Sequence, residues 1–160
     1  MTIDHLGKFV WPNAAWCSLI GRLAFPIYAF LIVNGYRHTK NVRRYALRLG
    51  LFALLSEVPF DLMVFGAPFD LAAQNVFFTL FLGLLAIWCG EQQEGRYRGS
   101  SLLLCMAAAT LFATDYSLFG VGLIWLYHWA GANKGKQLAA TGGVFLLDVY
   151  KRQPRVVLTP

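Results

Sequence analysis

Long apolar stretches alternate with short polar connections along most of the chain. This pattern predicts helices that cross a membrane, because about 20 mostly apolar residues span the hydrocarbon core of a bilayer. We expect six to seven membrane segments, several of them shorter than a full span. The expected segments cover residues 16–36, 47–60, 76–89, 100–113 and 118–130, with the end of an earlier helix in 1–12 and the start of a last one in 137–147.

Positive charges gather in every second connection. The connection at 37–48 holds five Lys or Arg, and two later connections hold two each, whereas the connection at 59–74 has Asp61 and Asp70 and no cation. Nine cations therefore fall on one predicted side, and Lys8 falls near the other. Cytoplasmic loops of membrane proteins carry an excess of Lys and Arg. The cationic side is therefore predicted to face the cytoplasm, with the protein multi-pass in the membrane.

Composition narrows the class of protein. Apolar residues make up 58% of the chain, aromatic residues 16% and charged residues 14%, and the mean hydropathy is +0.52. An ordinary soluble domain is about 25% charged. A soluble fold would leave the excess apolar area in water, whereas lipid solvates apolar helix faces. On this basis we exclude a soluble enzyme, a disordered chain and a disulfide scaffold, and predict an all-α, polytopic transmembrane helix bundle in contact with membrane lipids.

The net charge of +6 suggests either a nucleic acid or a membrane surface as partner. Because the cations lie between apolar stretches, we assign them to topology and anionic headgroups and expect no nucleic-acid partner. The three cysteines, Cys17, Cys89 and Cys105, are scattered through apolar stretches without a CxxC motif. We expect buried thiols and no metal site.

No internal repeat or linker divides the chain, so residues 1–147 are predicted to form a single transmembrane domain. The apolar pattern stops at Leu147, and the polar sequence DVYKRQPRVVLTP follows. Its first part resembles translated adapter sequence, so we expect residues 148–160 to be a non-native or disordered tail. The first apolar stretch starts as though half a helix were missing, which indicates a fragment.

Six ionisable side chains lie at predicted membrane depth, where each costs at least about 2.5–3.5 kcal/mol. A histidine such as His5 can act as a base near neutral pH, and a nearby carboxylate would orient its ring, but from the residues alone a structural helix contact near the outer interface is favoured over catalysis. For Arg22, one turn before Pro26, a buried bridge to Asp4, Glu57 or Asp61 is favoured over a substrate contact. The six are Asp4, His5, Arg22, Glu57, Asp61 and Asp115.

One of these six, and one further polar group, are explained without any catalytic or binding role. Asp115 lies in a tight predicted turn, where turn formation explains it. His128 stands near the end of an apolar segment and is expected to lie at the membrane interface.

The segment 35–44 is dense in cations. Headgroup contact and topology explain them without any further function. A phosphate-rich cytosolic donor such as coenzyme A would suit the same cluster, because Arg binds phosphate in a bidentate manner. The candidate phosphate-binding residues are Arg37, Lys40, Arg43 and Arg44.

Five motifs resemble the TraX family in their order, over about residues 1–130. They are IDHLG, GRLAFPIYAFLIVNGYRHTKN, RYALRLGLFALLSEVPFDL, QNVFFTLFLGLLAIW and DYSLFGVGLIWLYHW. The resemblance implies a polytopic membrane protein, in a family named for the conjugation protein that acetylates the N-terminus of F-type pilin. It further implies a relation to membrane acyltransferases in which an intramembrane His on an early helix serves acyl transfer from a coenzyme A thioester.

Carried onto this chain, the resemblance implies that His5 is the catalytic histidine and acetyl-CoA the acyl donor. His5 would accept a proton from an amine or hydroxyl, or carry the acyl group itself. Asp4 or Asp61 would orient the ring, and Arg22 would stabilise the developing oxyanion. The acceptor stays open between pilin, a peptide, a sugar and a lipid headgroup.

Two other classes of function remain. A membrane transporter or carrier would also place Asp, His, Arg and Glu at membrane depth around a helix broken by proline. A non-catalytic membrane component of a conjugation or secretion assembly would need these groups only for helix packing.

Overall fold

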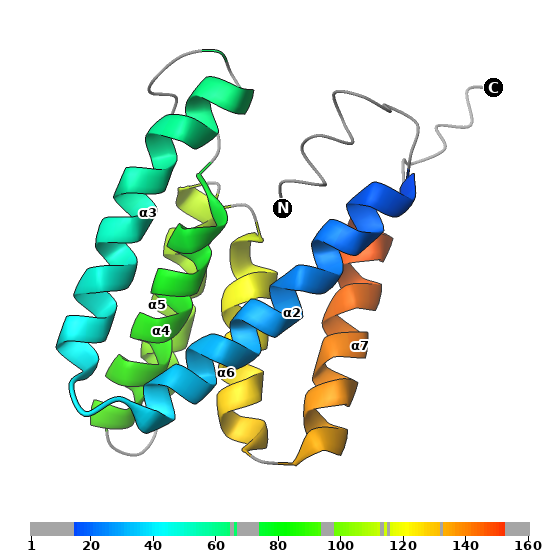
Figure 1. Cartoon of the computed structure of the whole chain (residues 1–160). Coiled ribbons are helices and arrows are strands. Elements are labelled where there is room, and N and C mark those ends of the chain that lie inside the picture. Colours follow the sequence, from blue (N-terminus) through cyan, green and yellow to red (C-terminus); the bar gives the residue numbers. More distant parts are fainter. Residues whose placement is uncertain are drawn as a thin grey trace.

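The computed structural model describes residues 15–64, 66, 74–93, 98–112, 114, 116–131 and 133–152. Nearly all of them are helical, and the only β-type pairing among them is an isolated bridge between Gln74 and Thr114. The all-α prediction is therefore confirmed. The helices are α2 (Ala15–His38), α3 (Val42–Val64), α4 (Val76–Gln92), α5 (Arg98–Leu111), α6 (Ser117–Ala130) and α7 (Lys134–Arg152) (Figure 1).

The observed helices follow the predicted apolar segments closely, with one correction at α3. The sequence pattern predicts a segment that ends at Phe60, directly after Pro59, with Asp61 in the following connection. The helix instead continues through Pro59 and Asp61 to Val64, and Asp61 is buried with 1% of its surface exposed. A proline inside a helix removes one backbone hydrogen bond and bends the helix without always ending it. Helix α7 also extends to Arg152, beyond the predicted domain boundary at residue 147.

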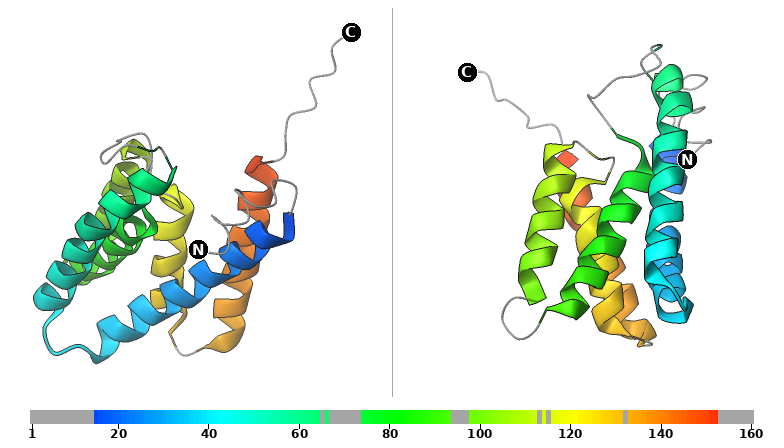
Figure 2. Two further views of the ribbon diagram at one scale, coloured as in Figure 1. Left: turned by 45° about the horizontal axis from the view of Figure 1, so that its top comes forward. Right: turned by 90° about the vertical axis from the view of Figure 1, so that its left-hand side faces the viewer.

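Helix α4 lies at the centre of the bundle and packs against α3, α5, α6 and α2. Its buried face includes Leu84 and Ile87, which pack with Ile124 of α6. Helix α2 runs obliquely across α6, whereas α3, α4 and α5 lie side by side (Figures 1 and 2). The core thus forms mainly where α2, α4 and α6 meet.

Two glycines allow α4 and α6 to approach closely. A Cβ added at Gly120 of α6 would collide with the side chain of Thr79 on α4, and it would lie 2.7 Å from the Cβ of Tyr116 and 2.9 Å from the Cζ of Phe25. A Cβ added at Gly83 of α4 would collide with the side chain of Ile124. Small residues of this kind let helix backbones pack together where larger side chains would hold them apart.

The helix ends explain where the cations gather. Helices α2, α4 and α6 end at one end of the bundle, where α3, α5 and α7 begin (Figure 1). We call this the cationic end, because Arg37, Lys40, Arg43, Lys134 and Lys136 lie at these helix ends and in the turns between them. The alternation of charge along the sequence therefore corresponds to one end of the folded bundle. Which side of a membrane this end faces stays a prediction.

Many large apolar side chains are exposed on the outer surface of the bundle. On α3 they include Leu47, Phe52 and Leu55, which are 64%, 61% and 72% exposed, and α5 exposes Leu103 and Leu104 in the same way. Among the described residues, none of the helices combines the length and the apolar character that a membrane crossing requires. The helix bundle of the sequence prediction is thus observed, while its membrane-spanning character is not established by these helices.

Candidate functional site

The residues that the sequence analysis placed at a catalytic centre fall largely outside the described structure. Asp4, His5 and Asp115 lie outside the described residues, and Arg22 is described only as part of the backbone of α2. Their predicted roles, including the bridge from Arg22 to Asp61 or Glu57, stay predictions.

Glu57 and Asp61 lie one helical turn apart on α3, as their spacing predicted. Glu57 accepts hydrogen bonds from the backbone N–H of Asn75 at 3.3 Å and from the Asn75 side chain. The same Asn75 amide donates to the carbonyl of Ala53 at 2.9 Å, and its side-chain oxygen caps α4 by accepting from the N–H of Phe77 at 2.9 Å. This cluster fastens the start of α4 to α3, at the end of the bundle opposite the cationic end.

The four predicted phosphate-binding cations lie at the end of α2, at the start of α3 and in the turn between them. Arg37 reaches from the end of α2 to α6, where its Nη2 donates to the backbone carbonyl of His128 at 2.7 Å. Lys40, Arg43 and Arg44 are exposed at the turn from α2 to α3. The structure thus sets Arg37 apart from the other three.

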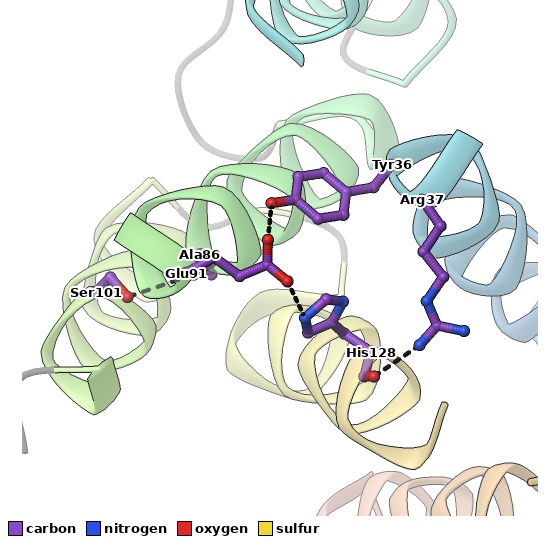
Figure 3. A network of polar contacts seen from close by, with 6 residues as sticks. All are labelled: Tyr36, Arg37, Ala86, Glu91, Ser101 and His128. Atoms are coloured by element: carbon purple, nitrogen blue, oxygen red, sulfur yellow. Dashed lines mark hydrogen bonds and ion pairs between the residues drawn. The ribbon is translucent and has the colours of Figure 1, made fainter. Parts of the chain in front are cut away.

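A polar network joins three helices at the cationic end (Figure 3). The hydroxyl of Tyr36 on α2 donates to Oε2 of Glu91 on α4 at 2.5 Å. The other carboxylate oxygen of Glu91 lies 3.0 Å from Nε2 of His128 on α6. The Tyr36 and His128 rings pack edge to face, with their centroids 5.6 Å apart. Each of the three side chains is therefore held by contacts from two other helices.

A cavity of about 280 Å³ opens beside this network, between the ends of α4 and α6. Trp129, which is 67% exposed, lines it, and the ammonium group of Lys136 from α7 lies 5.0 Å from the centroid of the Trp129 ring. The cavity is lined by Ile87, Gly90, Glu91, Trp125, His128 and Trp129.

The Glu91–His128 pair and the neighbouring cavity together can orient an imidazole ring beside a bound ligand. A carboxylate bonded to one nitrogen of an imidazole fixes the ring orientation and stabilises its protonated form. A ligand in the cavity would meet this pair and two indole rings, and the cations Arg37 and Lys136 contact two of the lining residues, His128 and Trp129. Among the described residues, no group of His, Cys, Asp and Glu side chains is arranged to hold a metal ion.

The sequence analysis did not identify this network. His128 was assigned to the membrane interface, and neither Tyr36 nor Glu91 was considered as a site residue. A signal was nevertheless present in the sequence. Tyr36, Glu91 and His128 each stand at the last turn of an apolar segment that ends on the predicted cationic side.

The sequence profile of the family described as TraX protein matches residues 1–151, which is most of the chain. The chain is 26% identical over 176 residues to "Probable fimbrial assembly protein FimC, serogroup H1" of Dichelobacter nodosus, an alignment that covers 99% of this chain and 72% of that protein. It is also 26% identical over 131 residues to "Protein TraX" of Escherichia coli (strain K12), covering 80% of this chain and half of that protein. No solved structure matches the chain significantly. The chain belongs to the TraX family.

Proposed function

We propose that this TraX-family chain is a polytopic membrane acetyltransferase that serves the assembly of a pilus or a conjugation apparatus. Its donor is acetyl-CoA, and its acceptor is an amine or a hydroxyl of a pilin, another peptide, a sugar or a lipid headgroup. The printed names of the two relatives, one for fimbrial assembly and one TraX, support the pilus-related or conjugation-related role. Neither name mentions acetyl transfer, which we propose on other grounds.

The observation that carries the acetyl-transfer proposal is the composition of the cationic end. Arg37, the pair of Glu91 and His128, and a cavity open between α4 and α6 all lie there. Coenzyme A carries several phosphate groups, and Arg binds phosphate strongly through charge-assisted hydrogen bonds. An anionic donor approaching the bundle would therefore be attracted to this end.

The exposed apolar surface supports a location in the bacterial cytoplasmic membrane. Helix α3 has 23 residues and is therefore about 34 Å long, and its outward side exposes Leu47, Leu51, Phe52 and Leu55. Contiguous exposed apolar surface of this kind is rare on soluble monomers. In the proposed arrangement lipid covers these side chains, the protein is multi-pass, and the cationic end faces the cytoplasm.

The chemistry follows the roles that the family resemblance implies. The acceptor nitrogen or oxygen forms a bond to the thioester carbonyl carbon, the carbon–sulfur bond breaks, and coenzyme A leaves as its thiol. His5 accepts the proton that the acceptor loses and passes it to the departing sulfur, and Asp4 or Asp61 orients the His5 ring. Arg22 stabilises the negative charge that develops on the carbonyl oxygen.

The test uses the full chain reconstituted in lipid nanodiscs with isotope-labelled acetyl-CoA and a panel of peptide, sugar and lipid acceptors, with products identified by mass spectrometry. His5→Ala and His5→Gln should each lower acetyl transfer by about 10²–10⁴-fold, because neither side chain transfers a proton. His38→Gln is the matched control, since His38 is exposed at the end of α2 and bonds only locally, to the carbonyl of Asn34 at 2.8 Å. Equal activity in the His5 variants and the parent protein would refute the catalytic assignment, and no transfer to any acceptor would refute the enzymatic proposal.

A further inference from the structure

The cavity at the cationic end combines aromatic and cationic groups in a way that the proposed catalytic chemistry does not use. Two of its lining residues, Trp125 and Trp129, come from α6 and lie about one turn apart. Trp129 is 67% exposed, so a ligand outside the bundle can reach its indole ring, over which the ammonium group of Lys136 lies.

Two cations from two other helices lie against residues of this cavity. Arg37 of α2 is fixed by its hydrogen bond of 2.7 Å to the carbonyl of His128. The ammonium group of Lys136 on α7 lies 5.0 Å from the Trp129 ring centroid, which is within the range of a cation–π contact. The cavity therefore has an aromatic wall with positive charge beside it.

We propose that this cavity binds an adenine nucleotide, namely the nucleotide end of the acyl donor, with the base stacked on Trp129 and the phosphates on Arg37 and Lys136. Indole rings stack on the faces of nucleobases, and Arg and Lys bind phosphate oxygens. Glu91 is half exposed, and a carboxylate has about four acceptor positions, so it can receive the exocyclic amine of adenine as well as its two present contacts. The identification of the nucleotide as coenzyme A rests on the proposed function.

This inference moves the donor site away from the turn between α2 and α3. Arg43 and Arg44, which the sequence pattern assigned to the phosphates, are exposed at that turn and do not line the cavity. Tryptophan also occurs at membrane interfaces as a simple anchor. An interfacial anchor needs neither a cavity nor neighbouring cations, and a tryptophan with that role alone would not affect nucleotide binding.

The test is a calorimetric titration of the full chain in nanodiscs with adenosine 3′,5′-bisphosphate, which carries the base and phosphates but no thiol or acyl group. Trp129→Ala should weaken binding about tenfold, because stacking on one aromatic side chain is lost, and Trp129→Phe should restore most of it. Lys136→Gln should also weaken binding. Arg43→Gln is the matched control, since it removes one cation at the same end without touching the cavity.

Three outcomes would overturn the nucleotide site. One is weaker binding in Arg43→Gln with unchanged binding in Trp129→Ala. Another is inorganic pyrophosphate binding as tightly as the bisphosphate, because a simple phosphate or headgroup site needs no base. A third is an acetyl-transfer rate that depends on acetyl-CoA concentration in the same way in Trp129→Ala as in the parent protein. That result would refute donor binding at the cavity and leave the proposed acetyltransferase activity standing. Bisphosphate binding that depends on Trp129 in a chain without acetyl transfer would instead support the site and refute the proposed function.

Discussion

The carboxylate of Glu91 at the end of α4 lies 3.0 Å from Nε2 of His128 at the end of α6. The two residues are 37 positions apart in sequence and meet because both helices end at the cationic end of the bundle. Tyr36 donates to the same carboxylate, so one side chain of α4 holds the ends of α2 and α6 together. The position of the neighbouring cavity therefore depends on Glu91.

We expect Tyr36→Phe to lower the stability of the bundle by about 1 kcal/mol, because it removes the hydrogen bond to Glu91 and keeps the ring. Thermal or denaturant unfolding in detergent measures this change. Tyr28→Phe is the control, since Tyr28 is 42% exposed on the same helix. In the double variant with Glu91→Ala, the two losses should not add, because both substitutions remove the same contact. Fully additive losses would show that the contact does not contribute to stability.

The close approach of α4 and α6 makes a second prediction. Gly120→Ala should destabilise the protein by about 1–3 kcal/mol, because the added methyl group overlaps the Thr79 side chain of α4 as well as the side chains of Tyr116 and Phe25. Gly122→Ala on the same helix is the control, since its nearest atom beyond the local backbone is the Cε of Met106 at 3.9 Å. That control should be neutral or stabilising by about 0.5–1 kcal/mol, because alanine favours the helix. A Gly120→Ala protein as stable as the parent would contradict the observed packing.

The stability of an Asn75→Asp variant is expected to depend on pH. In the parent protein the Asn75 side chain donates a hydrogen bond to the Glu57 carboxylate and caps α4 with its oxygen. Asn75→Asp keeps the capping oxygen but replaces the donor with a second carboxyl group beside Glu57. Two adjacent carboxylates repel, and a proton bound to either one relieves the repulsion. The stability of Asn75→Asp should therefore rise as pH falls from 8 to about 5, whereas that of Asn75→Ser should change no more than the parent protein. A flat pH dependence of the difference between the two variants would exclude this contact.

The orientation of the bundle can be tested by cysteine labelling in intact cells. In a background without Cys17, Cys89 and Cys105, a cysteine at Asp70 should react with a membrane-impermeant reagent from outside, and a cysteine at Lys40 should not. Both should react after the membrane is permeabilised, which serves as the control. The reverse pattern would place the cationic end outside and separate it from cytosolic acetyl-CoA.

The sequence by itself determined where the helices lie and at which ends the charges gather. Apolar runs bounded by polar connections fixed α2, α4 and α6 to within a few residues, because the burial of apolar side chains depends on local periodicity. The same local pattern predicted the end of α3 wrongly near Pro59, because packing around the helix decides whether a helix ends or continues at a proline. Asp61 became part of α3 for that reason.

Only the tertiary structure decided which polar groups meet. Each of Tyr36, Glu91 and His128 is a polar residue near the end of its own helix, and their contacts depend on how far each helix extends and how α2 crosses α6. Likewise, Arg37 and Arg43 look equivalent along the sequence, yet only the rotation of α2 directs Arg37 to the carbonyl of His128. Helix periodicity fixes the face of a residue on its own helix, whereas the partner on another helix is set by crossing angle and packing, for which single residues carry no local signal.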